Sequence, residues 1–304
     1  SLAIMGLLNP AATINSGEIH FHHSSSPVSL LKLSDKEMRQ YRGNEIAMIF
    51  QEPMTSLNPV IKCGEQVSEA LRLHKSLSKR QAKEKTIEWF KEVQLPRPEQ
   101  IYESYPHQIS GGQKQRVMIA MAMCCEPQLL IADEPTTALD VTVQKTILEL
   151  IKSLQLKHNM SVIFITHDLG VVAEIADEVV VMKSGQKGEY NQTSTLFENP
   201  SHPYTKGLLA CRPPMDFRLT RLPTVQDFLS LNKNQSVNSF LSELKISEKE
   251  QERALNEVLS KPRLIEIENL KTYFPIQEGI FRKTVGHVKA VDDVSFYVHE
   301  GETL

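Results

Sequence analysis

Cysteine, positive charge and long apolar runs are all scarce in this sequence of 304 residues. Its four cysteines include no Cys-x-x-Cys pair, which is too few for a disulfide scaffold and favours a reducing compartment. The net charge of −3 gives no electrostatic basis for binding nucleic acid. No apolar run approaches the ~18 residues that a membrane-spanning helix needs, and the first residues lack the basic flank of a signal peptide.

The remaining composition is typical of a globular protein, with 40% hydrophobic and 23% charged residues. The length predicts roughly two domains of about 150 residues each. Cys124 and Cys125 stand in an apolar helical run, so we expect them to be buried packing residues. His20, His22 and His23 follow a short predicted strand, and a polar turn explains them better than a metal site.

Three apolar segments in the first 170 residues predict buried strands: Glu45–Gln51, Leu129–Ala132 and Ser161–Thr166. Another strand is predicted at Glu178–Met182, and a short one at Gly17–Phe21. Apolar periodicity predicts helices at Ser1–Leu8, from Ser34 to near Gly43, over most of Pro59–Pro106, from Ser110 to about Cys125, at Thr142–His158 and at Leu169–Ala176. Ser34 with Glu37 and Ser78 with Gln81 have the spacing of capping boxes that open two of these helices. Buried strands that alternate with helices favour an α/β fold with a parallel sheet.

The sequence changes in character after Asn199. A short helix is predicted to begin near His202 and to end at Pro213-Pro214. Asp216–Lys261 is polar and reads as a linker with one or two helices, one of them opened by a Ser247/Glu250 capping box. Strands are then predicted at Leu264–Phe274, His287–Val291 and Val294–His299.

Polar residues stand at the ends of three predicted strands. Asp133 and Glu134 follow one strand, Gln51 ends another, and His167 follows the third. Each residue alone is weak evidence, because Asp-Glu-Pro can simply end a strand. Four such residues on one sheet edge match what phosphoryl transfer needs: a metal ligand, a base that positions water, and donors for the developing negative charge.

The segment Ser110-Gly111-Gly112-Gln113 opens a helix. Exposed N–H groups and the positive end of the helix make such a turn a possible anion site, and glycine lets a phosphate approach the backbone. An ordinary helix cap formed by Ser110 and Gln113 explains the same residues equally well.

The order and spacing of these motifs resemble those of the ATP-binding subunits of ABC transporters. The matching segments are Phe50–Pro53 (similar to the Q-loop), Ile109–Gln113 (similar to the LSGGQ signature, with Ile first), Leu130–Glu134 (similar to Walker B), Thr137–Asp140 (similar to the D-loop) and Thr166–Asp168 (similar to the switch histidine). The resemblance implies a P-loop NTPase fold with a parallel-sheet core, a β subdomain and a helical subdomain at about residues 59–125.

The resemblance also implies roles for particular residues. Glu134, His167 and Gln51 would be catalytic, and Asp133 and Gln51 would hold Mg²⁺. ATP would be contacted by Ser110, Gly111, Gly112, Gln113 and Asp140, and its adenine would stack on Tyr273 or, as the near alternative, on Phe274. A strand aromatic packed in a core would explain Tyr273 as well.

Two segments resemble the dipeptide, oligopeptide and nickel importer branch of the family: Met54–Pro59 and His202–Thr205. Some members of that branch carry a cysteine cluster for an iron–sulfur centre after the second segment. Only Cys211 stands there in this sequence, so we predict no such cluster.

No Gly-x-x-x-x-Gly-Lys-Ser/Thr phosphate loop occurs in the sequence. In the family, one would lie just before Ser1 and another just after Leu304. We therefore expect the middle of a tandem protein whose two ABC domains pair head to tail, each phosphate loop facing the partner's signature. The expected boundaries are a first ABC domain at 1–199, a His-Pro-Tyr extension at 200–215, a helical linker at 216–262 and the start of a second ABC domain at 263–304.

The expected function is hydrolysis of ATP to energise an importer of peptides or related solutes, such as dipeptides, oligopeptides, glutathione or nickel. The implied partners are integral-membrane permease subunits and, indirectly, a substrate-binding protein, at the cytoplasmic face of the bacterial inner membrane. Residues 1–304 alone would bind ATP weakly. The alternative is a tandem ABC ATPase without membrane subunits that acts on ribosomes or DNA. The compact helical insert and the short linker at 216–261 argue against it.

Overall fold

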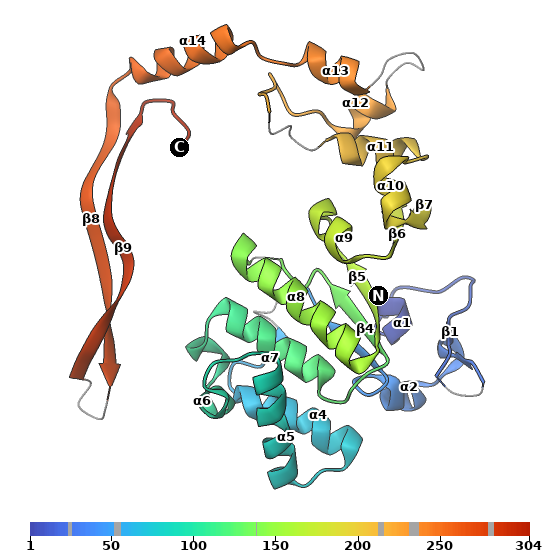
Figure 1. Ribbon diagram of the computed structural model, residues 1–304. Coiled ribbons are helices and arrows are strands. Elements are labelled where there is room, and N and C mark those ends of the chain that lie inside the picture. Colours follow the sequence, from blue (N-terminus) through green and yellow to red (C-terminus); the bar gives the residue numbers. More distant parts are fainter. Residues whose placement is uncertain (24–25, 52–55, 138, 212–215, 231–236, 279–282) are drawn as a thin grey trace. The chain divides into compact units, whose positions relative to one another are not determined.

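The computed structural model of the protein describes residues 1–23, 26–51, 56–137, 139–211, 216–230, 237–278 and 283–304. Contacts divide the chain into two units, Ser1–Asn199 and Pro200–Leu304, and most of their helices and strands are labelled in Figure 1. Several residues of the predicted motifs lie outside the described residues: Glu52, Pro53, Met54, Thr55, Ala138, Pro213 and Pro214.

A three-stranded parallel sheet forms the centre of the first unit. Its strands are β3 (Ile46–Ile49), β4 (Leu129–Asp133) and β5 (Ser161–Ile165), in the spatial order β3-β4-β5. The register places Ile49 beside Ala132, and Ala132 beside Phe164. The carboxyl ends of all three strands therefore lie at one edge of the sheet, and the predicted parallel α/β sheet is confirmed.

Helices cover both faces of this sheet. Ala47, Ile49 and Leu130 belong to a buried cluster with α7 (Gly111–Met123) and α8 (Val141–His158). Ile46 and Ile131 point to the other face and pack with the N-terminal elements. Successive residues of a strand face opposite sides, which is why neighbouring apolar residues serve two different cores.

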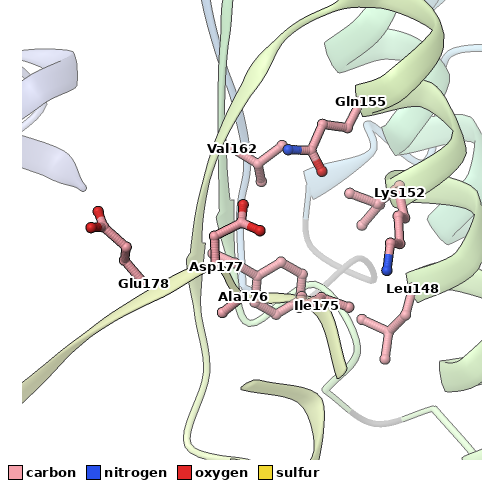
Figure 2. A pocket seen from close by; sticks show the side chains of 10 residues that line it. Leu148, Lys152, Gln155, Val162, Ile175, Ala176, Asp177 and Glu178 are labelled. Atoms are coloured by element: carbon pink, nitrogen blue, oxygen red, sulfur yellow. The ribbon is translucent and has the colours of Figure 1, made fainter. Parts of the chain in front are cut away.

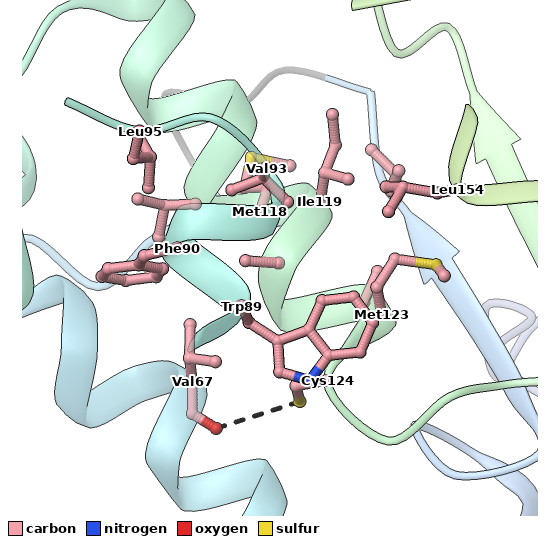
Figure 3. Close-up of a cluster of buried hydrophobic side chains, with 14 of the residues drawn as sticks. Val67, Trp89, Phe90, Val93, Leu95, Met118, Ile119, Met123, Cys124 and Leu154 are labelled. Carbon is pink, nitrogen blue, oxygen red and sulfur yellow. Dashed lines mark hydrogen bonds between the residues drawn. The ribbon is translucent and has the colours of Figure 1, made fainter. Parts of the chain in front are cut away.

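The segment between β3 and β4 is helical, as predicted. It contains α4 (Cys63–Lys75), α5 (Lys79–Glu92), α6 (Pro98–Glu103), the 3-10 turn η2 (Pro106–Gln108) and α7. The predicted capping box of Ser78 and Gln81 opens α5. The apolar face of α5 is fully buried, and Figure 3 shows Trp89, Phe90 and Val93 packed against side chains of α7. Cys124 and Cys125 lie in the same core, as expected.

The last turns of α5 and α8 are joined by one compact contact. The rings of Trp89 and His158 are 5.1 Å apart, centroid to centroid. Glu92 accepts hydrogen bonds from Lys157 Nζ and from His158 Nε2, both over 2.7 Å. The helical segment is thus fixed to the helix that covers the sheet.

The N-terminal elements are α1 (Leu2–Met5), β1 (His20–Phe21), β2 (Val28–Ser29), the 3-10 turn η1 (Leu30–Lys32) and α2 (Asp35–Tyr41). The predicted Ser34/Glu37 capping box of α2 is present. The predictions that α1 extends to Leu8 and that the first strand begins at Gly17 were wrong. Gly6 has φ 61° and ends α1, while Arg42 donates to the carbonyl oxygens of Met5 and Gly6.

The first unit ends with α9 (Leu169–Ile175), β6 (Glu178–Lys183), β7 (Gln186–Gln192) and α10 (Thr193–Glu198). The strand predicted at 178–182 exists, but β6 pairs antiparallel with β7 in a separate two-stranded sheet. Strand β7 was not predicted. Ser184 and Gly185 both have positive φ, which suits a tight hairpin turn.

The second unit begins with α11 (Pro203–Ala210), whose cap is the side chain of His202. The predicted helix start is confirmed, but the helix ends at Ala210, before the prolines. The described part of the linker contains α12 (Val225–Leu229), α13 (Val237–Glu243) and α14 (Glu248–Leu259). The sequence predicted one or two helices there, so the structure has one more than predicted. The Ser247/Glu250 capping box opens α14, which has no buried residue.

A long antiparallel hairpin closes the second unit. Strand β8 (Arg263–Glu278) pairs with β9 (Lys283–His299). The two strands predicted at 287–291 and 294–299 are a single strand with an irregularity between Val291 and Val294, where Asp293 has φ 63°. Within the described part of the chain, no helix combines the length and the apolar character needed to cross a membrane.

Candidate functional site

Three polar side chains from separate loops meet at the carboxyl edge of the parallel sheet. Gln51 follows β3, Glu134 follows β4 and His167 follows β5. Gln51 Nε2 donates to Glu134 Oε2 over 2.9 Å, and His167 Nδ1 lies 3.1 Å from Glu134 Oε1. The structure therefore brings together the three residues that the sequence nominated for catalysis.

The carboxylate of Glu134 has a third partner, which the sequence analysis did not assign. Thr137 Oγ1 donates to Glu134 Oε2 over 3.0 Å. Hydrogen bonds from His167 and then from Thr137 hold the pKa of Glu134 below its ordinary value, although burial acts in the opposite direction. An ionised carboxylate only accepts hydrogen bonds, so Nδ1 of His167 carries the proton of their shared bond.

The backbone of Glu134 is as constrained as its side chain. Its φ is 46°, in the left-handed region that residues other than glycine rarely adopt. Its N–H donates to the carbonyl oxygen of Ile165 over 2.9 Å, and its own carbonyl accepts from the N–H of Thr137 over 3.2 Å. Such conformations are concentrated at functional sites, where the surrounding structure holds them in place.

Asp133 is the last residue of β4, one position before Glu134. Its Oδ2 accepts a hydrogen bond from Ser1 Oγ over 2.9 Å. Since Gln51 uses its Nε2 to bind Glu134, its amide oxygen remains available beside this edge. A carboxylate and an amide oxygen are hard ligands that suit Mg²⁺. The described residues contain no group of three or more His, Cys, Asp or Glu side chains that could hold a metal ion by themselves.

The turn at Ser110 forms the cap of α7. Gln113 N donates to Ser110 Oγ over 3.3 Å, and Ser110 N donates to Gln113 Oε1 over 2.9 Å. A Cβ atom at Gly111 would meet no atom within 4 Å, so there is open space beside the backbone of this residue. The helix cap and the anion site remain compatible, because one capping box leaves other N–H groups of the first turn exposed.

Asp140 lies at the start of α8, close to the start of α7. Its Oδ1 accepts from the N–H of Val143 over 2.9 Å and caps α8. A Cβ atom on Gly112 would lie 3.1 Å from the side chain of Val143, so a larger residue there would require Val143 to shift by a few tenths of an ångström. The start of α7 at Gly112 therefore lies against Val143, in the first turn of the helix that Asp140 caps.

Tyr273 lies on β8, in the second unit. Its hydroxyl donates to Asp292 on β9, and Lys289 Nζ donates to the same carboxylate over 2.8 Å. Lys289 Nζ also lies 5.4 Å from the centre of the Tyr273 ring. Tyr273 is 39% exposed and Phe274 is 60% exposed, so both aromatic side chains of the prediction are accessible in this unit.

Two hollows of the first unit differ in their relation to these residues. One of about 470 Å³ is lined by Phe50, Gln51, Ser56, Met118 and Met121, among others, and lies beside the catalytic candidate Gln51. Another of about 280 Å³ lies between α8, β5 and the start of β6 (Figure 2). Its walls include Leu148, Val162 and Ile175, with Lys152 and Asp177 at the rim, and none of the predicted site residues lines it.

Comparison with known proteins identifies the family. The family model described as "ABC transporter" matches residues 2–137, and the model described as "Oligopeptide/dipeptide transporter, C-terminal region" matches residues 189–234. The dipeptide transport ATP-binding protein DppD of Bacillus subtilis is 50% identical over 226 residues, which cover 74% of this chain and 66% of DppD. The chain belongs to the ABC transporter family of ATP-binding proteins.

Other ABC relatives match along the whole chain. The glutathione import ATP-binding protein GsiA of Pectobacterium atrosepticum is 43% identical over 307 residues, and GsiA of Escherichia coli is 42% identical over 306 residues. Each alignment covers 100% of this chain and 47% of the relative, so the chain spans about half the length of these proteins.

Solved ABC cassettes share the fold. The dimeric structure of the ATP-binding cassette MJ0796 in a post-hydrolysis state with ADP and Pi is 25% identical, with a TM-score of 0.54, and covers 63% of this chain and 79% of its own. Another dimeric MJ0796 structure, titled a bacterial ABC transporter cassette, is 28% identical, with a TM-score of 0.52, and covers 59% and 74% of the two chains. The P-loop ABC fold class is thereby confirmed.

Proposed function

We propose that this chain is part of the ATP-hydrolysing subunit of an ABC importer for peptides or related small solutes, glutathione included. The observation that carries the proposal is the hydrogen-bonded group of Gln51, Glu134 and His167 at the carboxyl edge of the sheet. The ABC family and the names of the relatives, which concern glutathione import and dipeptide transport, support it. These names also favour import over an action on ribosomes or DNA.

In the proposed reaction, Glu134 accepts a proton from a water molecule at its carboxylate. The oxygen of this water bonds to the γ-phosphorus of ATP, the bond from the γ-phosphorus to the bridging oxygen breaks, and its electron pair stays on ADP. His167 and Gln51 leave Glu134 and donate to the γ-phosphate and to the water, where charge develops. Asp133 and the amide oxygen of Gln51 would hold Mg²⁺, which neutralises phosphate charge when bound.

The second group of residues would serve another nucleotide. Ser110, Gly111, Gly112 and Gln113 would cap the phosphates of an ATP bound by a partner ABC domain, with Asp140 beside them and Tyr273 stacked on its adenine. The related cassettes are dimeric, which supports a pairing of ABC domains, and the proposed pairing is head to tail. Closing of the pair around ATP and opening after hydrolysis would then drive transport.

The permease subunits would dock beside Gln51. The hollow there is lined by the exposed Phe50, the partly buried Met121 and the buried Met118, which form an adaptable apolar wall for an inserted helix. Docking at this place would put the membrane partner next to a residue that contacts Glu134. The subunit would then sit peripherally at the cytoplasmic face of the inner membrane, with a substrate-binding protein as an indirect partner.

The decisive test is Glu134→Gln in the full-length gene product, since the chain spans about half of its relatives. Hydrolysis is expected to fall at least ~100-fold while ATP stays bound, because the amide cannot take the proton of water. Glu69→Gln, on the exposed surface of α4, is the matched control and should hydrolyse ATP normally. Near-normal hydrolysis by Glu134→Gln would contradict the proposal.

The transport part needs its own experiment. The full-length protein should copurify with integral-membrane permease subunits, and deleting its gene should reduce uptake of labelled glutathione or dipeptides by the cells. Copurification with ribosomes or DNA in place of permeases would favour the alternative.

A further inference from the structure

Thr137 is the partner of Glu134 that stands closest to it in the chain. Its hydroxyl donates to Oε2 of Glu134 over 3.0 Å, the oxygen that also accepts from Gln51, while His167 contacts Oε1. The carboxylate is therefore held by donors from three different loops. These donors differ in how firmly the fold attaches them to Glu134.

Thr137 is tied to Glu134 by a tight turn. The N–H of Thr137 donates to the carbonyl oxygen of Glu134 over 3.2 Å, which closes a four-residue turn with Pro135 at its second position. Proline suits that position because its ring fixes φ. Pro135 and Thr136 are both buried, so the turn is fixed by packing as well as by its hydrogen bond.

The other two donors are attached more loosely. The side chain of His167 is 77% exposed, whereas that of Glu134 is 22% exposed. Gln51 stands two residues beyond the end of β3 and is itself exposed. Both residues can therefore turn towards a ligand without disturbing the turn that holds Thr137.

We propose that Thr137 is the positioning residue that keeps the carboxylate of Glu134 oriented while Gln51 and His167 engage the nucleotide. The inference rests on the proposed function. With Oε2 still bound to the Thr137 hydroxyl, Oε1 is the oxygen that His167 vacates and that takes the proton of the attacking water. Thr137 contacts neither ATP nor water in this scheme and acts only through Glu134.

The test compares three variants of the full-length gene product in steady-state ATP hydrolysis. Thr137→Val keeps the shape of the side chain and removes the hydroxyl, and kcat is expected to fall about ten- to a hundredfold, which corresponds to the 1.5–3 kcal/mol of a hydrogen bond to a charged group. KM for ATP should change less than about twofold, because the ground-state contacts of ATP are untouched. Thr137→Ser keeps the hydroxyl and should restore kcat to within about threefold.

The third variant, Thr142→Val, removes an exposed hydroxyl from the first turn of α8 and should leave kcat unchanged. If Thr137→Val keeps wild-type kcat, or if Thr137→Ser is as impaired as Thr137→Val, the positioning role is wrong. If Thr137→Val shows no cooperative thermal transition, Thr137→Ala is used in its place. The expected fall in kcat is the same, and Thr137→Ser should again restore kcat. Normal ATP hydrolysis by Glu134→Gln would overturn the proposed function itself. If Glu134→Gln is inactive but Thr137→Val hydrolyses ATP normally, only the positioning role of Thr137 is overturned.

Discussion

Gln51 and Glu134 are 83 positions apart in the sequence, yet Gln51 Nε2 donates to Glu134 Oε2 over 2.9 Å. The register of β3 and β4 explains the contact, because Ile49 pairs with Ala132. Gln51 stands two residues after Ile49, and Glu134 stands two residues after Ala132. Parallel strands bring distant residues to one edge in this way, and α/β sheets place their ligands at the carboxyl edge. The contact also leaves Gln51 close to the hollow lined by Phe50, Met118 and Met121.

His167→Ala is expected to lower kcat for ATP hydrolysis by about 100- to 1,000-fold, the range measured when one oriented donor to a transition state is removed. KM for ATP should change little. His22→Ala removes an exposed histidine away from this edge and serves as the control. Steady-state kinetics of the full-length gene product measure both, and a kcat above a third of wild type for His167→Ala would contradict the role.

Tyr273→Ala is expected to raise KM for ATP about five- to 150-fold, since stacking of a base on an aromatic ring is worth about 1–3 kcal/mol. Tyr273→Phe keeps the ring but loses the bond to Asp292, so it should have a much smaller effect. Adjacent residues of a strand face opposite sides, which makes Phe274→Ala the matched comparison. A raised KM in Phe274→Ala with a normal KM in Tyr273→Ala would assign the stacking to Phe274.

Gly64→Ala is expected to destabilise the helical segment by about 2 kcal/mol or more. A Cβ atom at this position would lie 2.1 Å from the ring of Tyr102, which is fully buried and hydrogen-bonded to Ser68. Overpacking of this kind usually costs about 1–3 kcal/mol. Urea denaturation followed by circular dichroism measures the loss. Gly111→Ala, where a Cβ meets no atom within 4 Å, should unfold at the wild-type urea concentration.

Glu103 should make the free energy of unfolding of the helical segment depend on pH. Hydrogen bonds from Lys62 and Lys83 lower its pKa from 4.5 to about 2. A carboxylate whose pKa is lower in the folded state stabilises the fold fully above the unfolded value, and the benefit is lost as the pH falls from about 4.5 to about 2. The urea midpoint of Glu103→Gln should therefore lie below that of wild type at pH 6 and approach it at pH 3. A difference that stays constant with pH would contradict this coupling.

Local chemistry explains most of what could be predicted from the sequence. Four capping boxes were predicted by spacing alone and are present, because their hydrogen bonds join residues three positions apart; they are opened by Ser34, Ser78, Ser110 and Ser247. The three strands of the parallel sheet were predictable for a similar reason, since a continuous apolar run between polar ends favours a strand. The prediction that all three are buried was wrong for β5, whose residues are exposed or half-buried, with Ile163 37% exposed.

The features that were missed depend on partners far away in the sequence or on a single backbone angle. Helix α1 stops at Met5 partly because Arg42, 37 positions later, binds its last carbonyl groups. Strand β6 is as apolar as a core strand, but its pairing with the polar β7 could not be read from its own residues. The hydrogen bond from Thr137 to Glu134 also depends on the positive φ of Glu134. Pro135 indicates a turn, but nothing in the sequence indicates that positive φ.

The contact of Trp89 with His158 has a practical consequence. Trp89 is the single tryptophan of the sequence, it is 2% exposed, and its Nε1 has no hydrogen-bond partner among the described residues. Its fluorescence therefore arises from one place, the joint between α5 and α8, and a neighbouring imidazole is an efficient quencher when protonated. Any rotation of the helical segment away from α8 would change the intensity and the emission maximum together. Trp89 is thus a built-in optical sensor for any such rotation within residues 1–304, and no label is needed to follow it in real time.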